Sequence, residues 1–391
     1  MTPRTASAAP AVCLGESMAM LIPEPPGPLE LAESFRHSYG GAESNTACTL
    51  AALGVPAAWI SRVGADGFGR RLVERIAAHG VDVSGVVTDP ARPTGLYVKE
   101  TGAGADHPYD LGAGRSRLHY YRRGSAASAM GPELLADPAA EPLFAAAGLV
   151  HLTGITPALS DSCHRLVRTL LATPGRLVSF DLNWRPALWA GRDRQALRFL
   201  MNAADVVLLG ADEAREVLGT DEPAALRKLL PRPGVLVLKD DARQATAIAP
   251  DGTLTTEPAL RVEVVEPTGA GDAFAAGYLA GTLRGLPEAA RLRLGHLTAA
   301  AALTSRGDLG TPPPAELVDQ LLELDAPGWA ATTVGTDGYH LGGGAAASGE
   351  GEGEGEGASG GGHGAPGGPA GARVLGAAST GRAHTPPGGG R

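Results

Sequence analysis

Apolar residues recur along the central part of the chain in short unbroken runs, and segments with helical spacing separate these runs. The runs are GLVHLTG (148–154), RLVSFDLN (176–183), DVVLLG (205–210) and GVLVLKD (234–240). Between and after them we expect helices over 160–172, 193–203 and 211–218. Apolar strands that do not alternate with polar residues are typical of a parallel sheet covered on both faces. The pattern therefore predicts a three-layer α/β/α fold with a mostly parallel central sheet.

The flanking segments extend this architecture. Before the central runs we expect a strand, a turn and a second strand over 11–23, a helix over 40–54, a strand over 57–64 and a helix that ends at the glycine cap Gly80. After them we expect the strand pair ATAIAP and TLTTEP, a strand RVEVV (261–265) and helices over 270–284 and 288–304. Two segments, 18–37 and 94–123, do not fit the alternation of strands and helices. We expect them to form a small β-lid over the sheet.

Composition divides the chain into three parts. Residues 1–10 are small and polar, and we expect them to be flexible. From about residue 326 onward the chain is rich in glycine, includes GEGEGEG and is almost free of aliphatic residues. Such a segment cannot bury enough apolar surface to offset its ordering entropy. We therefore expect 326–391 to be a disordered tail and 11–325 to be one globular domain.

Charge, hydropathy and cysteine content argue against nucleic-acid-binding, secreted and membrane proteins. The net charge of −9 and the absence of a basic run argue against a nucleic-acid partner. No apolar stretch approaches 18 residues in length, so we expect neither an export signal nor a membrane span. The three cysteines, Cys13, Cys48 and Cys163, have no metal-binding spacing. This sparse, odd set suits reduced thiols in the cytoplasm.

The stretch VVEPTGAGDAF (264–274) carries the clearest candidate chemistry. Gly269–Gly271 follow an expected strand and open an expected helix, so their backbone N–H groups can converge on an anion at the positive end of the helix dipole. Asp272 falls in the first helical turn. One interpretation is that its carboxylate only complements the dipole. The other is phosphoryl transfer, in which the N–H groups stabilise the transferring group and Asp272 accepts the proton of the attacking hydroxyl.

Two common nucleotide-binding motifs are absent. The P-loop requires a Gly-Lys pair, which occurs nowhere, and the first strand–helix turn lacks G-x-G-x-x-G. Instead, PTGAGDAFAAGYLAG (267–281) closely resembles the C-terminal signature of ribokinase-like (PfkB-type) carbohydrate kinases. GGAESN (40–45) resembles the glycine pair and sugar-binding asparagine of that family, and VGADGFG (63–69) resembles the segment that usually follows. The resemblance covers nearly all of 11–325.

The resemblance implies a role for each matching residue. Asp272 would be the catalytic base, and Gly269, Ala270 and Gly271 would form the anion hole. ATP would be the phosphoryl donor, with Mg²⁺ carried mainly by its phosphates and Glu213 near the metal only through water. The implied nucleotide-binding residues are Asn183, Lys239, Thr268, Gly269, Gly271 and His296. Pairing of two lids would cover exposed sheet edges, so we also expect a homodimer.

Two further stretches bear on the substrate. HYYRRGSAAS (119–128) and SFDLNWRPALW (179–189) resemble segments of 2-keto-3-deoxygluconate kinases within the family. Arginine binds a carboxylate through two hydrogen bonds, so Arg122 and Arg185 suit a sugar acid. The implied substrate-binding residues are Gly41, Asn45, Tyr97, Tyr120, Arg122, Arg185 and Asp308. The expected reaction is phosphorylation of the C6 hydroxyl of 2-keto-3-deoxy-D-gluconate by ATP.

The sequence departs from the family pattern mainly on the nucleotide side. Glu266 replaces the usual aspartate at a position often near a monovalent cation, so a dependence on that cation is left open. Gly210 stands where asparagine is common. The loop KDDARQA keeps Lys239 but has Asp241 and Gln244 in place of glycines, and His296 stands where an asparagine often borders the adenine.

Two alternatives to the sugar-acid kinase stay open. One is a kinase for a neutral sugar such as fructose or ribose, which has no use for two convergent arginines. The other is a pseudokinase that binds a sugar acid and turns over poorly, which the altered nucleotide loop favours and the intact Asp272 disfavours. Arg185 also has a purely structural interpretation, in which it forms an ion pair with Asp181 and does not bind substrate.

Overall fold

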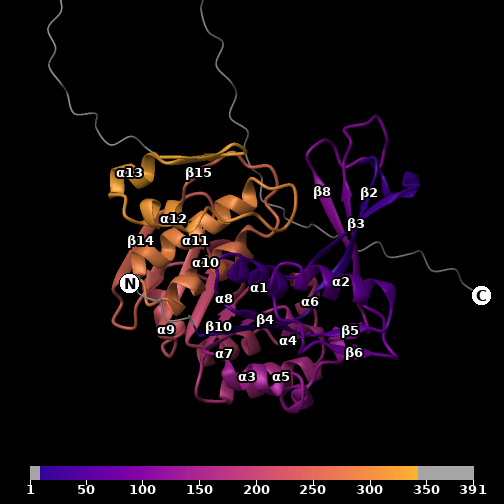
Figure 1. Ribbon diagram of the computed structural model, residues 1–391, viewed down its shortest axis with the longest axis horizontal. Helices are drawn as coiled ribbons and strands as arrows, with labels where there is room; N and C mark the ends of the chain where they lie inside the picture. The colour runs from indigo at the N-terminus through magenta and orange to yellow at the C-terminus, as the bar shows by residue number, and fades with distance from the viewer. Residues whose placement is uncertain (1–8, 342–391) are drawn as a thin grey trace, which may run out of the picture. The chain divides into compact units, whose positions relative to one another are not determined.

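The long apolar runs form the central sheet. The computed structural model describes residues 9–341 and contains an eight-stranded sheet of order β14-β13-β12-β11-β10-β9-β1-β4 (Figure 1). Neighbouring strands from β4 to β12 are parallel, and β13 and β14 add an antiparallel edge. The strands are β1 (Ala11–Leu14), β4 (Ala57–Ile60), β9 (Leu149–Thr153), β10 (Leu177–Asp181), β11 (Val206–Gly210), β12 (Val235–Asp240), β13 (Gln244–Ile248) and β14 (Leu254–Pro258). The expected α/β fold is confirmed.

Helices cover both faces of this sheet, because alternate strand residues point to opposite sides. Val12 and Leu14 belong to one apolar core, and Ala11 and Cys13 belong to the other. The first core is closed by α3 (Glu141–Ala146), α5 (Asp161–Ala172), α7 (Gln195–Ala203), α8 (Ala211–Leu218) and α9 (Pro223–Leu229). The second is closed by α1 (Ala42–Ala52), α2 (Gly67–Ala77), α10 (Ala270–Leu283), α11 (Glu288–Leu303), α12 (Ala315–Leu322) and α13 (Ala326–Ala331). Two short helices, α4 (Thr156–Leu159) and α6 (Pro186–Trp189), follow β9 and β10.

The expected β-lid is a separate four-stranded sheet of order β3-β2-β7-β8. Its strands are β2 (Met18–Pro23), β3 (Phe35–Gly40), β7 (Leu96–Thr101) and β8 (Ser116–Tyr121). The first lid segment extends to Gly40, three residues beyond its expected end, and so reaches the start of α1. The lid strands therefore lead directly into elements of the main domain.

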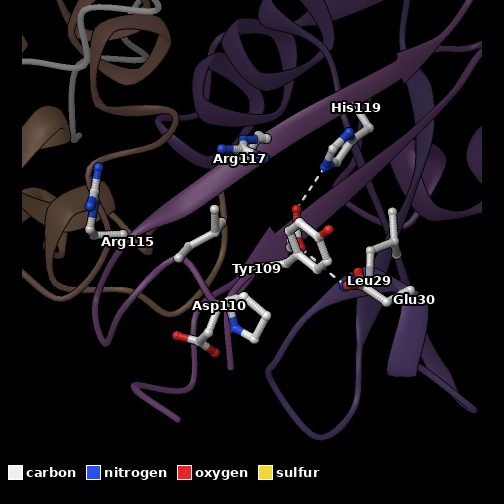
Figure 2. Close-up of a pocket in the computed structure, with 10 residues that line it drawn as sticks. Leu29, Glu30, Tyr109, Asp110, Arg115, Arg117 and His119 are labelled. Atoms are coloured by element: carbon white, nitrogen blue, oxygen red, sulfur yellow. Dashed lines mark hydrogen bonds and ion pairs between the residues drawn. The ribbon is translucent and has the colours of Figure 1, made fainter. Parts of the chain in front are cut away.

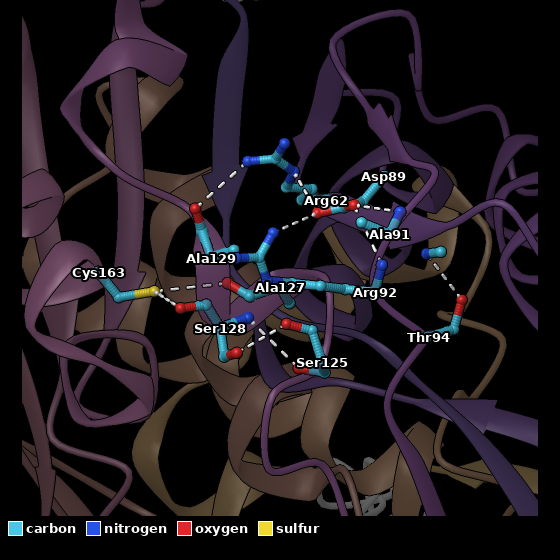
Figure 3. A network of polar contacts seen from close by, with 11 residues as sticks. Arg62, Asp89, Ala91, Arg92, Thr94, Ser125, Ala127, Ser128, Ala129 and Cys163 are labelled. Atoms are coloured by element: carbon cyan, nitrogen blue, oxygen red, sulfur yellow. Dashed lines mark hydrogen bonds and ion pairs between the residues drawn. The ribbon is translucent and has the colours of Figure 1, made fainter.

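Polar contacts fix the base of the lid, and Figure 3 shows those around Arg62, Asp89 and Arg92. Asp66 caps α2 by accepting a hydrogen bond of 2.8 Å from Gly69 N, and its other oxygen accepts one of 2.8 Å from Thr94 N, just before β7. Nearby, Asp89 of β6 (Val87–Asp89) pairs with Arg62 of β5 (Arg62–Gly64) at 3.1 Å. The segment VGADGFG thus has a structural role, since it ties the start of a lid strand to the main domain.

The strand expected over 261–265 is wrong in extent and in placement. Only Arg261–Val262 (β15) is a strand, and it pairs with β16 (Thr333–Gly335) in a small separate sheet that also contains β17 (Gly338–His340). Val264 and Val265 are 56% and 41% exposed. Their apolar pattern is that of a buried strand, but in the described part of the chain neither residue pairs with a strand, and Val265 N donates to Leu303 O of α11 instead.

The expected start of the disordered tail is also wrong. Residues 326–341 contain α13, β16 and β17, and Trp329 of α13 is fully buried. Its indole Nε1 donates a hydrogen bond of 2.8 Å to Pro258 O, and the guanidinium of Arg293 lies 5.0 Å from its ring centre. Trp329 and Val334 bury apolar surface and so order this segment. The glycine-rich average composition of 326–391 hides these two residues. Residues 342–391, like residues 1–8, lie outside the described part of the chain.

The expectations of no membrane span and of reduced cysteines concern the whole chain, and the structure bears on them only for residues 9–341. Within that range no helix has the length and apolar character needed to cross a bilayer. Cys13, Cys48 and Cys163 are free thiols, and all three are buried. Their burial places them in the packing of the domain.

The ordered C-terminal segment leads to a stability prediction. Replacing a fully buried tryptophan by alanine costs about 3 kcal/mol or more, so Trp329→Ala should lower the thermal midpoint by several degrees. Tyr109→Ala, which removes an aromatic ring that is 69% exposed, serves as the control and should leave the midpoint within about 1 °C. Equal midpoints for the two variants, measured by calorimetry, would show that 326–341 does not stabilise the domain.

Candidate active site

The glycine turn lies at the start of α10, as expected. Gly269 precedes the helix with φ of +85°, in the left-handed region that glycine adopts without strain. A Cβ on Gly269 would lie 2.2 Å from the carbonyl oxygen of Asp308, so this approach also requires glycine. The turn follows an irregular segment, not the strand that the sequence suggested.

Asp272 occupies the first turn of α10, and two asparagines hold its carboxylate. Asn45 Nδ2 of α1 donates to one carboxylate oxygen at 3.0 Å, and Asn183 Nδ2, in the loop after β10, donates to the other at 3.2 Å. Asn183 has φ of +38°, a conformation that asparagine tolerates better than most residues. The two amide oxygens are buried and accept no hydrogen bond from residues 9–341. They are free to accept hydrogen bonds from a bound ligand.

The surroundings of Asp272 suit a general base. Burial is the main effect and raises the pKa of Asp272 to about 7. The hydrogen bond from Asn45 and the charges of Arg185 and Lys239 lower this pKa, and the charge of Asp181 raises it. A carboxylate with a pKa near neutrality can both accept and release a proton at physiological pH.

A buried ion pair lies next to the turn. Lys239 Nζ at the end of β12 donates to Asp181 Oδ2 at the end of β10 at 2.7 Å. Burial lowers the pKa of Lys239, but the charges of Asp181 and Glu213 outweigh this effect and raise it overall, so the lysine stays positive. A Cβ on Gly271 would lie 3.9 Å from Lys239 Nζ. A fixed positive charge therefore stands beside the glycine turn.

Glu213 is held by backbone groups. Its Oε1 accepts a hydrogen bond from Trp184 N at 2.7 Å, and its Oε2 accepts one from Gly210 N at 2.9 Å. Burial raises the pKa of Glu213. Gly210, where the family often has asparagine, here begins α8 and leaves its N–H to this carboxylate. Because both oxygens are engaged, Glu213 suits a contact with a metal through water better than a direct bond.

Tyr97 and Asp308 meet above the glycine pair. The hydrogen bond from Tyr97 lowers the pKa of Asp308, yet burial raises it to about 6. A Cβ on Gly40 would lie 2.4 Å from the Tyr97 hydroxyl and 2.6 Å from Asp308 Oδ2. Gly40 is thus a site residue that sequence reasoning missed, although the glycine pair gave the signal. Gly41 packs against the backbone of the neighbouring turn, since a Cβ there would lie 2.5 Å from Glu16 O.

The two arginines have different surroundings. Arg122 is largely buried and pairs with Glu16, with 2.7 Å between its Nε and Oε2 of the carboxylate. Its guanidinium lies 5.7 Å from the ring centre of Tyr120, whose ring centre is 5.7 Å from that of Tyr97. The residues from the two lid strands therefore come together as expected.

Arg185 is exposed and carries no carboxylate partner within residues 9–341. Its only hydrogen bond there runs from Nη1 to Trp184 O at 2.9 Å. Asp181, the partner considered from the sequence, is taken by Lys239. Arg185 nevertheless lies close enough to Asp272 to lower the pKa of that carboxyl group.

Two of the predicted nucleotide-binding residues make contacts of another kind. The hydroxyl and the N–H of Thr268 donate to Glu266 Oε1 at 2.7 Å and 3.2 Å, and Glu266 Oε2 pairs with Lys99 of the lid at 2.5 Å. His296 is buried, with its ring 5.2 Å from Phe274 between centres.

The surroundings of His296 differ from those of an open nucleotide pocket. Its Nε2 lies 3.1 Å from Glu257 O, its ring centre is 6.5 Å from that of Trp329, and burial lowers its pKa to about 4. Asp241, with φ of +44° in the turn after β12, and Gln244, the first residue of β13, are both exposed. Nucleotide contacts by Thr268 and His296 stay a prediction.

A cavity of about 680 Å³ lies on the lid and shares no residue with the Asp272 site (Figure 2). At its wall, Glu100 Oε2 lies 2.8 Å from His119 Nε2, and Glu100 Oε1 accepts a hydrogen bond of 3.0 Å from Leu29 N. Across the described residues, no group of three or more histidine, cysteine, aspartate or glutamate side chains is arranged to hold a metal ion.

Comparison with known proteins agrees with the geometry. The model of the pfkB family of carbohydrate kinases matches residues 9–315. A 2-dehydro-3-deoxygluconokinase of Thermoproteus tenax is 37% identical over 317 residues, which cover 80% of this chain and 94% of that protein.

Solved structures support the same assignment. The crystal structure of a PfkB protein from Polaromonas sp. JS666 has a TM-score of 0.68 at 34% identity and covers 79% of this chain and 99% of that one. That of a fructokinase with bound ATP from Xylella fastidiosa has a TM-score of 0.68 at 26% identity and covers 81% and 98%. These matches confirm the resemblance and the fold. The chain belongs to the pfkB family of carbohydrate kinases, enzymes that transfer a phosphoryl group to an alcohol.

Proposed function

We propose that this kinase phosphorylates the C6 hydroxyl of 2-keto-3-deoxy-D-gluconate with ATP. The observation that carries the choice of a sugar acid is Arg185, which lies near Asp272 and has no carboxylate partner in residues 9–341. A substrate carboxylate would supply that partner. The similarity to the 2-dehydro-3-deoxygluconokinase of T. tenax supports the proposal.

The chemistry starts at Asp272. Its carboxylate, oriented by Asn45 and Asn183, accepts the proton as the C6 hydroxyl attacks. The N–H groups of Gly269–Gly271 and the ammonium of Lys239 stabilise negative charge on the phosphoryl group as it moves. Because these donors are already fixed, little reorganisation is needed when the charge develops.

The rest of the sugar is held by residues of the lid and its base. Arg122 and Arg185 would bind the carboxylate, while Tyr97, Tyr120 and Asp308 would contact the hydroxyls. Closure of the lid would exclude water and so limit wasteful hydrolysis of ATP.

The nucleotide side fits ATP in part. Lys239 and the start of α10 favour phosphates, whereas Thr268 is already engaged by Glu266, and the exposed, negatively charged Asp241 follows Lys239 by two residues in the chain. Magnesium, when bound with ATP, supplies positive charge to the phosphates, and Glu213 would orient its water. The ion pair with Glu266 sets the positive charge of Lys99 at a position that in the family is often near a monovalent cation, so we propose no requirement for such a cation.

Two further features belong to this proposal. We place the enzyme in the cytoplasm, in keeping with its three free thiols. We also propose a homodimer through the lid, supported by the exposed side chains of Phe35, Leu118 and Tyr121. A monomer at micromolar concentration in sedimentation would contradict the dimer.

A substrate panel tests the proposed function. ADP release from ATP and magnesium should be measured with 2-keto-3-deoxygluconate, its galacto epimer, fructose and ribose. We expect turnover on the acids alone. Turnover on fructose or ribose would favour the neutral-sugar kinase. Binding of the acid without turnover on any substrate would favour the pseudokinase.

The pKa of Asp272 predicts the pH dependence. Because the base must be deprotonated, kcat/KM for the sugar should rise with pH, level off above about 7 and fall about tenfold per pH unit below it. Asp181→Asn removes a negative neighbour and should move this limb to lower pH. Asp272→Asn should lower kcat by about 10²- to 10⁴-fold while sugar binding, followed by calorimetry, survives. A profile that is flat between pH 5 and 8 would contradict the role of Asp272.

Loss of Arg185 should affect acids selectively. A hydrogen bond to a charged group contributes about 1.5–3 kcal/mol, so Arg185→Ala should reduce kcat/KM for the acid roughly 10- to 100-fold. Any neutral sugar that is turned over should change by less than about threefold. Arg194→Ala, which removes an arginine stacked on the Trp184 ring at 5.0 Å, is the matched control. Equal losses on acid and neutral sugars would rule out recognition of the carboxylate by Arg185.

A further inference from the structure

We propose that Glu16 is a positioning residue that sets the selectivity for a carboxylate by fixing the guanidinium of Arg122. The inference rests on the proposed sugar-acid function. Glu16 belongs to the turn between β1 and β2, where the chain leaves the central sheet and enters the lid. Nothing in its sequence context pointed to a role in the site.

The contacts of Glu16 hold the Arg122 side chain in one orientation. Its side chain is fully buried, and Arg122 is 11% exposed. Oε2 of Glu16 accepts a hydrogen bond from Arg122 Nε at 2.7 Å and also contacts Nη2, while Oε1 accepts one from Ser125 Oγ at 2.6 Å. Both oxygens are therefore used, and the carboxylate cannot rotate without losing a partner.

The atoms involved decide which part of Arg122 stays free. Glu16 takes the side edge of the guanidinium, formed by Nε and Nη2. The end edge, formed by Nη1 and the second hydrogen of Nη2, makes no hydrogen bond to any residue from 9 to 341. That edge presents two parallel N–H groups, the arrangement that binds a carboxylate through two hydrogen bonds. Glu16 thus orients Arg122 and leaves its carboxylate-binding edge open.

Preorganisation explains why this fixed orientation is useful. A free arginine side chain loses rotamer freedom when it is fixed, and this loss weakens binding. In this chain the fixing is done before the substrate arrives, and the ring of Tyr120 at 5.7 Å from the guanidinium adds a second support. The substrate carboxylate would meet an arginine already in place.

The charges of Glu16 and Arg122 cancel, so we assign a separate role to the charge of Arg185. Glu16 neutralises Arg122, so Arg122 contributes hydrogen-bond geometry more than net charge. Arg185, which is exposed and unpaired within the described residues, contributes the net positive charge that balances the substrate. Arg122 thus supplies the hydrogen-bond geometry and Arg185 supplies the charge. Only the geometry of Arg122 depends on Glu16.

The test compares KM and kcat for 2-keto-3-deoxygluconate in variants of the full chain. Glu16→Ala should raise KM at least tenfold and change kcat less than threefold. Glu16→Gln keeps an acceptor in the same place and should stay within threefold of the wild-type KM. Ser125→Ala, which removes one support, should raise KM two- to fivefold. Glu24→Ala removes an exposed glutamate–arginine pair of the same lid, formed with Arg36 at 3.1 Å, and is the matched control that should change neither constant.

A double-mutant cycle separates positioning from general support of the fold. In an Arg122→Ala background, Glu16→Ala should change KM less than twofold, because its target is gone. Independent, additive effects on KM, or a fall in kcat of Glu16→Ala with KM unchanged, would overturn the inference. If Glu16→Ala does not fold, an unchanged KM in Ser125→Ala would overturn it. Failure of the wild type to bind or phosphorylate the acid would overturn the proposed function, and with it this inference, whereas wild-type turnover with unaffected variants would overturn the inference alone.

Discussion

The approach of Gly269 to the backbone of Asp308 is the contact on which the site depends. It brings the loop after α11 against the start of α10. Asp308, proposed to bind the sugar, therefore packs directly against the glycine turn, proposed to bind the phosphate. A side chain at Gly269 would separate them, because its Cβ would lie 2.2 Å from Asp308 O. The distance between Asp308 and the glycine turn is therefore set by backbone packing, which is stiffer than a side-chain contact.

Buried charge is the second constraint. Asp181, Glu213 and Asp272 lie around a single lysine, and like charges in such a setting disfavour full ionisation. Lys239 stabilises Asp181 directly, and Glu213 is stabilised by two backbone N–H groups. Asp272 receives hydrogen bonds only from neutral amides, and burial raises its pKa to about 7. The same cluster thus keeps one group charged for structure and leaves another able to exchange its proton.

Much of this arrangement follows from the sequence, and the exceptions have physical causes. Apolar runs and glycine caps have local signals, so the central sheet, most long helices and the turn before Asp272 are predictable. The exposed Val264 and Val265 imitate a strand because periodicity records apolar character and not the presence of a pairing partner. Glu16 has no local signal, because its contacts are with Arg122 and Ser125, which are distant in the chain, whereas the glycine pair did mark Gly40.

The burial of Trp329 has a consequence for how the domain is delimited. A chain cut at residue 325, where composition alone suggests the end, would uncover one side of the His296 ring and leave Pro258 O without its indole donor. It would also remove the apolar contacts of the fully buried Trp329 ring. For expression, fusion or crystallisation the C-terminal boundary therefore belongs after β17, at residue 341, some sixteen residues beyond the point that glycine content marks.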